Sequence, residues 1–342
     1  MARPNISLSH FLRGVLLSIL ITFPVFSMAA LNQDVHSPIR VPHYLIKQRN
    51  SAGLHSKTLK IDDVTWRYSE GGANNKPTVL LIHGLASNRN HWNGVAHFLT
   101  SDYHVIIPDL PGNGETKVSD HFDLSIPNVT ERLRRFVETL NIENKLHIAG
   151  HSLGGSIAIV YASQYPFDTQ SLFLLNSAGI YKQANTAYTK DPHFLKNLIV
   201  SKPGDLDEVL NQVMQTPPVL PPYFKKAQEK ILIAQASQTR KMIDQLVTLN
   251  HIYTPESFAR LTRTIEAPTL ILWGKQDKII NVEAATELHG LLKRADPLVI
   301  LNNVGHMPIL EAQQQVALHY LPFLAKTQKL KNPLADKLIL LN

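Results

Sequence analysis

The stretch that decides the fold is Lys145-Leu-His-Ile-Ala-Gly-His-Ser-Leu-Gly-Gly155, in which an apolar run leads directly into a glycine-flanked serine. Small and aliphatic residues typical of a helix follow at 155–162. A strand, a tight turn and a helix in this order give the pattern Gly-x-Ser-x-Gly a mechanistic meaning, because the turn lifts the serine hydroxyl out of the sheet edge. Glycines at 150 and 154 leave room where larger side chains would collide with the helix or the neighbouring strand. The pattern predicts that Ser152 is a nucleophile rather than part of an ordinary glycine-rich turn.

A serine hydroxyl becomes an effective nucleophile only beside a base that is itself oriented by an acid. Two later strand ends supply candidates in the order Ser, Asp, His. Asp277 follows the buried strand predicted at 269–273, and His306 lies in the loop after the apolar strand predicted at 298–301. Both side chains are expected at the carboxyl edge of a parallel sheet, where Ser152 also lies. We therefore predict that Ser152, Asp277 and His306 are the catalytic residues.

Backbone N–H groups that could stabilise an oxyanion are also predicted. The apolar strand at 78–83 is followed by Gly84 and Leu85. One donor is expected from this loop and one from the residue after the nucleophile, so we assign the N–H groups of Leu85 and Leu153. His83, which ends the strand, is expected to make a structural hydrogen bond rather than to act as the base.

Five motifs together resemble the α/β-hydrolase superfamily. They are His83-Gly84, Asp109-Leu-Pro-Gly-Asn-Gly114, Gly150-His-Ser-Leu-Gly-Gly155, Trp273-Gly-Lys-Gln-Asp277 and Gly305-His306. The resemblance covers about 55–328, and the run 265–280 with the preceding insert is most similar to bacterial lipases and α/β-hydrolase-domain monoacylglycerol lipases. It implies hydrolysis of carboxylic esters with a preference for acylglycerols. Thr116 departs from the serine more usual in the superfamily but keeps a hydroxyl.

Apolar runs alternate with helical stretches along most of the chain. Strands are predicted at 55–61, 64–68, 78–83, 104–108, 145–149, 171–175, 269–273 and 298–301. Helices are predicted at 91–99, 128–140, 153–164, 282–292 and 309–325. This alternation indicates an α/β fold with a mainly parallel eight-stranded sheet and helices on both faces, in which the first two strands form an antiparallel edge.

The alternation stops at 177–261, where helical segments such as 226–235 and a proline-rich break at 216–223 replace it. An insertion before the strand that leads to Asp277 is expected above the nucleophile, so we predict a helical cap there. The predicted parts of the chain are a first hydrolase core at 55–176, the cap at 177–261 and a second core at 262–328. Apolar residues of the cap are candidates either for an acyl pocket or for ordinary helix packing: Ile180, Leu195, Leu198, Ile199, Leu210, Val213, Met214 and Leu220.

The amino terminus carries a targeting pattern. Basic residues precede an apolar run at 14–26, and small residues follow up to Ala30. The run is shorter than the roughly 20 residues of a spanning helix, and Pro24 interrupts it. We predict a signal peptide over 1–30 and export to the periplasm or the medium. In the alternative, residues 11–30 remain as an inner-membrane anchor.

The two segments that flank the predicted core lack sustained periodicity. Residues 31–54 contain prolines and polar residues, so we expect a tether. The tail at 329–342 is either solvated or in contact with a membrane surface.

Composition narrows the classes of partner. The 34 basic and 27 acidic residues give a net charge of only +7, without a run of Lys and Arg interleaved with aromatics, so nucleic acid is not an expected partner. The absence of cysteine excludes disulfides, thiolate metal sites and a cysteine-linked lipid anchor. His147 and His151 share a His-x-x-x-His spacing but belong to a strand and a turn, so no metal is expected.

These observations predict a serine hydrolase that forms an acyl-enzyme and needs no cofactor, with a lipid or small ester as substrate. A lipase acting on acylglycerols is the preferred interpretation, and the oligomeric state stays open. The alternatives are a short-chain carboxylesterase, a carbon–carbon bond hydrolase of the same fold and a non-enzymatic binding protein. If Asp277 proved dispensable, Asp109 and Glu311 would be the next acids to consider.

Overall fold

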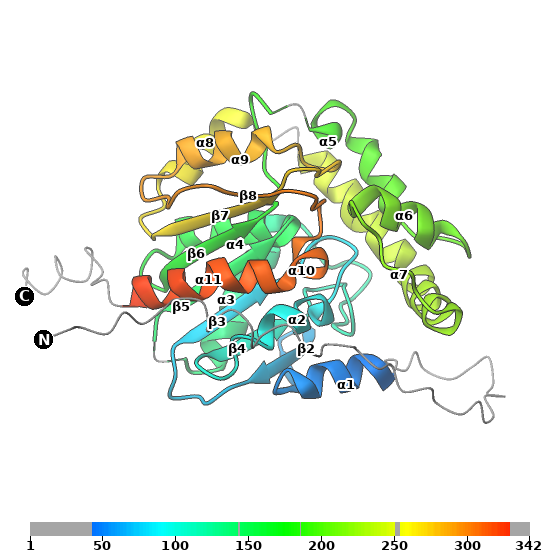
Figure 1. Ribbon diagram of the computed structural model, residues 1–342, viewed down its shortest axis with the longest axis horizontal. Coiled ribbons are helices and arrows are strands. Elements are labelled where there is room, and N and C mark those ends of the chain that lie inside the picture. Colours follow the sequence, from blue (N-terminus) through cyan, green and yellow to red (C-terminus); the bar gives the residue numbers. More distant parts are fainter. Residues whose placement is uncertain (1–42, 143, 185, 250–253, 329–342) are drawn as a thin grey trace, which may run out of the picture. The chain divides into compact units, whose positions relative to one another are not determined.

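An eight-stranded sheet forms the centre of the protein in the computed structural model, which describes residues 43–142, 144–184, 186–249 and 254–328 (Figure 1). The strands are β1 (Leu54–Ile61), β2 (Val64–Gly71), β3 (Thr78–Ile82), β4 (His104–Pro108), β5 (Leu146–His151), β6 (Thr169–Leu175), β7 (Thr269–Gly274) and β8 (Val299–Leu301). Their order across the sheet is β1-β2-β4-β3-β5-β6-β7-β8. The pairs β1–β2 and β2–β4 are antiparallel and the other pairs are parallel. The predicted mainly parallel eight-stranded sheet with an antiparallel edge is therefore confirmed.

The central strands are apolar because both of their faces are covered. Every residue of β3 and of β4 is buried. Since side chains alternate between the two faces of a sheet, Leu80 and Ile82 pack into one apolar core while Val79 and Leu81 pack into the other. The sequence of a parallel strand that is covered on both faces is therefore a continuous run of apolar residues.

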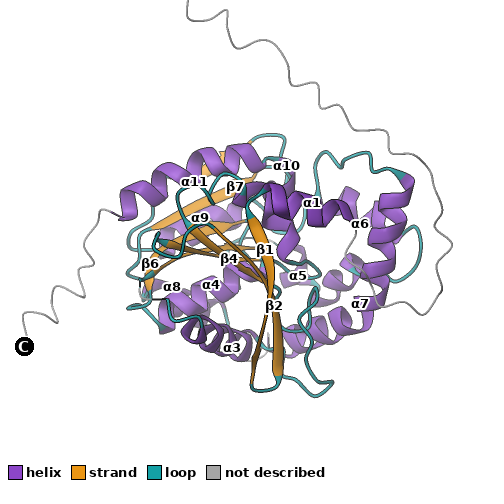
Figure 2. Ribbon diagram, turned by 90° about the horizontal axis from the view of Figure 1, so that it is seen from below, coloured by secondary structure: helices purple, strands orange, loops and turns teal. Residues whose placement is uncertain are grey.

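Helices cover both faces of the sheet (Figure 2). Helices α3 (Ile126–Thr139), α4 (Leu153–Gln164) and α9 (Glu283–Leu291) pack on the face of Leu80. Helices α2 (Asn93–Ala96) and α11 (Gln313–Gln328) pack on the face of Val79. Two predicted helices are each divided in the structure. A 3₁₀ turn, η1 (Arg89–Trp92), precedes α2, and a short helix, α10 (Pro308–Glu311), is separated from α11 by Ala312, whose φ of −143° and ψ of 37° are not helical.

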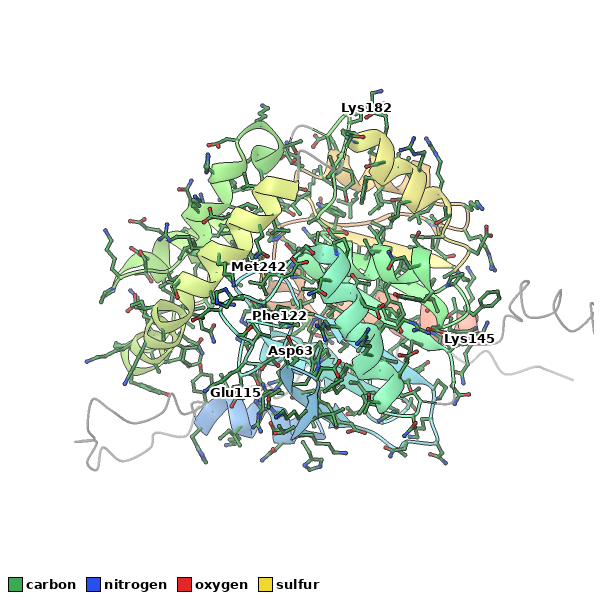
Figure 3. The ribbon with its side chains drawn as sticks, turned by 180° about the vertical axis from the view of Figure 1, so that it is seen from behind. Asp63, Glu115, Phe122, Lys145, Lys182 and Met242 are labelled. Carbon is green, nitrogen blue, oxygen red and sulfur yellow. The ribbon has the colours of Figure 1, made fainter. Side chains whose placement is uncertain are left out.

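A helical insert occupies the chain between β6 and β7. It comprises α5 (Ala187–Lys190), η2 (Pro192–Leu198), α6 (Asp205–Val213), α7 (Pro222–Leu249) and α8 (Pro255–Arg263). The proline-rich break lies between α6 and α7, and a capping box of Thr254 and Ser257 begins α8. Met242 of α7 shares an apolar core with Phe122 of the main domain (Figure 3), so the insert is packed on the rest of the fold.

The predicted tether at 31–54 is wrong for its carboxyl part, because residues His43–Ser51 form helix α1 and Leu54 already belongs to β1. Arg49 of α1 is buried, and its Nη2 donates to Asn90 Oδ1 at 2.6 Å. Burial lowers the pKa of the Arg49 guanidinium to about 10, and the nearby charge of Arg89 adds to this effect. Helix α1 has no apolar stripe, because polar side chains such as Arg49 hold it against the rest of the protein. Hydrophobic periodicity therefore could not predict this helix.

Several predictions concern residues outside the described part of the chain. They are the signal peptide or anchor at 1–30, the amino-terminal part of the tether and the tail at 329–342. Within the described residues, no helix has both the length and the apolar character that crossing a bilayer requires.

Candidate active site

The turn between β5 and α4 presents Ser152 at the carboxyl edge of the sheet. Its backbone has φ 54° and ψ −121°, a conformation that L-residues rarely adopt. A Cβ atom on Gly150 would lie 2.3 Å from the carbonyl oxygen of Gly154, and one on Gly154 would lie 2.3 Å from that of Ile82. Glycine is therefore required on both sides of the serine, as the sequence pattern predicts.

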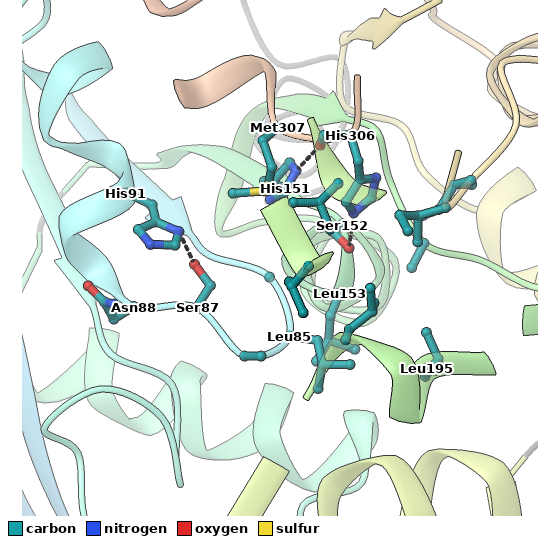
Figure 4. Close-up of a pocket in the computed structure, with 18 of the residues that line it drawn as sticks. Leu85, Ser87, Asn88, His91, His151, Ser152, Leu153, Leu195, His306 and Met307 are labelled. Carbon is teal, nitrogen blue, oxygen red and sulfur yellow. Dashed lines mark hydrogen bonds between the residues drawn. The ribbon is translucent and has the colours of Figure 1, made fainter. Parts of the chain in front are cut away.

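The structure brings Ser152, His306 and Asp277 together from three strand ends. Figure 4 shows the first two of these residues. His306 Nδ1 donates to Asp277 Oδ2 at 2.8 Å, since a carboxylate can only accept. The other ring nitrogen, Nε2, lies 3.0 Å from Ser152 Oγ and is then free to accept its proton. The side chains of His306 and Asp277 are buried. This arrangement can transfer a proton from the serine to the histidine while the carboxylate fixes the histidine tautomer.

Asp277 is held by more partners than the histidine alone. Its Oδ1 accepts the N–H groups of Ile279 at 2.8 Å and Ile280 at 2.9 Å. Its Oδ2 also accepts Asn176 Nδ2 at 2.7 Å. Asn176, which follows β6 with a positive φ of 43°, was not singled out in the sequence. Its position just beyond a strand at the same sheet edge was the signal that could have revealed it.

The two acids considered as substitutes for Asp277 have other partners. Asp109 is buried against Arg89, and its Oδ1 accepts the Arg89 N–H at 2.7 Å. The carboxylate of Glu311 accepts backbone N–H groups instead of the His306 ring. Within the described chain, Asp277 is thus the carboxylate that bonds to the histidine side chain.

Glu311 connects the histidine loop with the helical insert. Its Oε1 accepts the N–H groups of Gly305 at 3.0 Å and Met307 at 3.2 Å, on either side of His306. Its Oε2 accepts the Gln215 N–H at 2.7 Å from the segment after α6. The His306 N–H itself donates to the carbonyl oxygen of Val213 at 2.8 Å. The backbone of the histidine is therefore tied to the insert through both of these contacts.

His151 holds the other side of the His306 backbone. Its Nε2 donates to the His306 carbonyl oxygen at 2.6 Å. Burial, followed by the proximity of the His306 charge, lowers the pKa of His151 well below its usual value. His151 therefore stays neutral beside the serine and positions the His306 main chain.

The residues proposed to supply the oxyanion donors belong to the same cavity as Ser152. Both Leu85 and Leu153 line the cavity that contains Ser152. Within the described residues, neither backbone N–H has a protein acceptor, so both remain available to a bound oxygen. The loop lies close to the serine, because a Cβ atom on Gly84 would be 3.0 Å from Ser152 Cβ.

His83 has a structural environment. It is fully buried, and its Nε2 accepts the Leu110 N–H at 2.9 Å while its Nδ1 donates to the Gly84 carbonyl oxygen at 2.9 Å. Burial lowers the pKa of this imidazole, which stays neutral. His83 therefore links the loop at Gly84 and Leu85 to Leu110, in the segment after β4.

A cavity of about 850 Å³ opens above Ser152, between the sheet edge and the helical insert. All eight apolar residues proposed from the sequence line it: Ile180, Leu195, Leu198, Ile199, Leu210, Val213, Met214 and Leu220. Further apolar lining comes from α8 and from Ile279 and Ile280, which follow Asp277. An apolar enclosure of this size can hold an extended hydrocarbon chain.

Polar side chains gather on the side of the cavity that lies across from Leu195 of the insert, in the segment that follows Leu85 (Figure 4). Ser87 Oγ and His91 Nδ1 are 2.7 Å apart, and Asn88 lies near them (Figure 4). Gln48 also lines the cavity. Burial lowers the pKa of His91 to about 4, so its ring is neutral. Gln48 belongs to α1, in the segment that was expected to be a tether, and no sequence pattern indicated that it would line the cavity.

No group of three or more His, Cys, Asp or Glu side chains suited to a metal ion occurs among the residues that the structure describes.

The fold and the Ser-His-Asp geometry define the class of α/β hydrolases. The family description "alpha/beta hydrolase fold" matches residues 77–313, and the chain belongs to this family. Lipase 1 of Psychrobacter immobilis is 31% identical over 281 residues, which make up 81% of this chain and 86% of that protein. Monoacylglycerol lipase ABHD6 of Homo sapiens is 29% identical, with 83% and 86% covered.

A solved structure agrees with this assignment. The crystal structure of lip1 from Acinetobacter baumannii AYE has 61% sequence identity and a TM-score of 0.83, and the match covers 87% of this chain and 99% of that one. The predicted α/β-hydrolase fold and the predicted similarity to bacterial and monoacylglycerol lipases are confirmed.

We predict that Glu311→Gln lowers the kcat of ester hydrolysis about 10- to 100-fold, with a much smaller change in KM. The amide turns an NH2 group toward backbone N–H groups that the carboxylate accepted, so the loop around His306 shifts, while the apolar lining of the cavity is unchanged. Steady-state kinetics on a soluble p-nitrophenyl ester would measure both constants.

Glu283→Gln, at an exposed position at the start of α9, is the matched control and should leave both constants unchanged. A Glu311→Gln enzyme with normal kcat would contradict the positioning role. Thermal unfolding of both variants would distinguish a shifted loop from a destabilised protein.

Proposed function

We propose that this chain is a lipase that hydrolyses acylglycerols through an acyl-enzyme formed on Ser152. The observation that carries the proposal is the hydrogen-bonded series Ser152, His306 and Asp277 beside a mostly apolar cavity of about 850 Å³. Membership of the α/β-hydrolase family, together with relatives named as lipases, makes the chain a carboxylic-ester hydrolase. The acylglycerol substrate and the roles of individual residues are the proposed part.

In the first half-reaction, Ser152 Oγ attacks the ester carbonyl carbon while His306 Nε2 takes the hydroxyl proton. Asp277 keeps the proton on Nδ1 and stabilises the imidazolium that forms. The N–H groups of Leu85 and Leu153 donate to the oxyanion of the tetrahedral intermediate. The C–O bond to the alcohol then breaks, and the alcohol leaves with the proton from His306.

In the second half-reaction, water takes the place of the alcohol. His306 accepts a proton from the water as its oxygen attacks the acyl carbon, and the proton then returns to Ser152 Oγ as the ester bond to the enzyme breaks. The products are a fatty acid and the free enzyme. The reaction requires no oxidant, reductant or other co-reactant.

The two walls of the cavity favour one orientation of the substrate. The acyl chain would lie along the apolar residues of the insert, which thereby acts as a cap, and its burial is favourable by roughly 0.8 kcal/mol per methylene. The alcohol part would lie beside Ser87, Asn88 and His91, whose polar atoms suit the hydroxyl groups of glycerol.

We predict that Ser152→Ala and His306→Ala each abolish ester hydrolysis while the protein stays folded. Because the two residues act in the same steps, the double variant should be hardly slower than either single variant. Asp277→Asn should lower turnover on the order of 10⁴-fold, since the amide favours the wrong tautomer of His306. Turnover of p-nitrophenyl esters, with labelling by a fluorophosphonate probe, would measure these effects.

Three results would contradict the mechanism. They are labelling that persists in Ser152→Ala, losses that multiply in the double variant, and near-normal turnover in Asp277→Asn. Asp120→Asn, the same chemical change at an exposed position outside the cavity lining, is the matched control and should keep full turnover.

We predict that kcat/KM rises with acyl chain length until the cavity is filled, and that medium or long acyl esters of glycerol exceed acetate esters by at least about tenfold. Two buried methylenes already account for this factor. A series of glycerol esters and p-nitrophenyl esters of increasing chain length would measure the profile. Rates that peak at acetate or propionate would leave a short-chain carboxylesterase with the same nucleophile.

We further propose that the protein is exported and loses its first 29 or 30 residues. The basic, apolar and small-residue order that ends at Ala30 supports this proposal. Mass spectrometry of the protein from its native host should detect an amino terminus at Ala30 or Leu31. An intact amino terminus in the membrane fraction would instead favour an anchor over residues 11–30.

A further inference from the structure

The side-chain amide of Asn88 is held in one orientation at the wall of the cavity that contains Ser152. Its Oδ1 accepts the Asn90 N–H at 3.0 Å and Asn90 Nδ2 at 2.8 Å. Since a backbone N–H can only donate, the atom that faces it must be the amide oxygen. The NH2 group of Asn88 therefore lies on the other side of the amide. Among the residues that the structure describes, this NH2 group has no acceptor, and Asn88 lines the cavity.

The orientation of Asn88 depends on Arg49 through Asn90. Because Asn90 Nδ2 donates to Asn88, the Oδ1 of Asn90 faces the other way, where it accepts Arg49 Nη2 at 2.6 Å. A guanidinium has donors only, so the direction of each hydrogen bond in this series is fixed from both ends. The side chains of Arg49 and Asn90 are buried. The series therefore ends in the two N–H donors of Asn88 Nδ2.

Arg49 places a positive charge behind this series. Within the described chain it makes no ion pair of its own. The charged groups that act on it are Arg89, Glu115, Asp109 and Arg67, and the two acids pair with the other two arginines. Three guanidinium groups against two carboxylates leave one positive charge in excess. A buried guanidinium without a carboxylate of its own favours an anion in its neighbourhood.

The acidic groups near the cavity have other positions or other partners. Among the described residues that line the cavity, Glu311 is the one that belongs to the types Asp, Glu, Lys and Arg. Its carboxylate accepts the backbone N–H groups of Gly305, Met307 and Gln215. The acids of α6 are outside the lining: Asp205, Asp207 and Glu208. An anion beside Asn88 would therefore meet donors without an adjoining free carboxylate.

Asn88 lies beyond Ser87 and His91 as seen from Ser152 (Figure 4). A group on the alcohol side of the ester that reaches past these two residues would meet the NH2 group of Asn88. A phosphate oxygen needs donors only, whereas a hydroxyl also has a proton to donate. A hydrogen bond from an amide to an ionised oxygen is shorter and stronger than one to a neutral oxygen. The donors of Asn88 therefore suit a phosphate better than a hydroxyl.

We propose that Asn88 determines specificity by donating from Nδ2 to a phosphate oxygen, so that the substrates include lipid esters whose alcohol part carries a phosphate group. The inference rests on the proposed ester hydrolysis at Ser152 and extends its substrates beyond neutral acylglycerols. Arg49 is a positioning residue, which acts through Asn90 and supplies the positive charge. The bond that breaks is still the ester bond at the carbonyl carbon, and the phosphate stays on the alcohol product.

The test compares two esters that differ only in the phosphate, monolaurin and lauroyl lysophosphatidic acid, both below the concentration at which they form micelles. The readout is the ratio of kcat/KM for the phosphate ester to that for the neutral ester, which cancels a loss common to both. The variants of the full chain are Asn88→Ala, Asn88→Asp, Arg49→Met and Arg49→Lys. Asn75→Asp, at an exposed position outside the cavity lining, is the matched control.

The wild type should prefer the phosphate ester, and Asn88→Ala should lower the ratio about tenfold, mainly through KM. Asn88→Asp should lower it further, because a carboxylate repels the phosphate. Arg49→Met should also lower the ratio about tenfold, whereas Arg49→Lys, which keeps the charge, should retain part of the preference. Asn75→Asp should keep the wild-type ratio.

Two results would overturn the proposal. One is a wild type without preference for the phosphate ester. The other is an equal loss on both esters in the variants of Asn88 and Arg49, which would leave these residues a structural role alone.

Binding measurements separate phosphate recognition from the proposed function. Calorimetric titration of Ser152→Ala with each ester, with and without Asn88→Ala, measures affinity in the absence of turnover. If the wild type turned over neither ester, the hydrolase mechanism would be contradicted, while tighter binding of the phosphate ester that is lost in Asn88→Ala would still support the recognition. Normal turnover of monolaurin with equal affinity for the two esters would contradict phosphate recognition alone.

Discussion

The lack of space around the turn at Ser152 is the constraint to which the rest of the site conforms. Gly154 lies against the carbonyl oxygen of Ile82, so α4 begins in close contact with the end of β3. The same crowding holds Gly84 against the serine, and the next residue, Leu85, lines the cavity that contains Ser152. Backbone packing therefore holds the proposed nucleophile and the loop of its proposed oxyanion donor together, and the strained φ of Ser152 is maintained by the strands on either side.

The close packing of the site also determines which of its side chains carry a charge. Asp277 accepts hydrogen bonds from Asn176, His306 and two backbone N–H groups, so its charge is satisfied without water. Three other histidines close to the serine loop, His83, His91 and His151, have their pKa values lowered by burial and are neutral. In the proposed mechanism, an imidazolium on His306 would meet the fixed negative charge of Asp277, and these three neutral histidines would add no positive charge beside it.

Much of this arrangement could be predicted from sequence because it is encoded locally. The strands are continuous apolar runs, the serine turn has its glycines within the pentad, and Asp277 and His306 each follow a strand directly. What could not be predicted depends on contacts between distant segments. Helix α1 is docked by the buried Arg49 and by Tyr44, neither of which forms an apolar stripe. Asn176 and Glu311 look like ordinary polar residues until folding brings Asp277 to the first and Gln215 to the second, more than 90 positions away in each case.

Because the insert is hydrogen-bonded to the loop that carries His306, a change of the whole insert would also affect the position of the histidine. Val213 accepts the His306 N–H, and the Gln215 N–H donates to Glu311. The insert is thus a structural support for the base as well as a wall of the cavity. Exchange of the whole insert for that of another hydrolase would withdraw this support, so a transplanted segment would need to reproduce the backbone course at 213–215. Variation in substrate range is easier to accommodate in side chains along η2, α6 and α7, which change the cavity without moving the histidine.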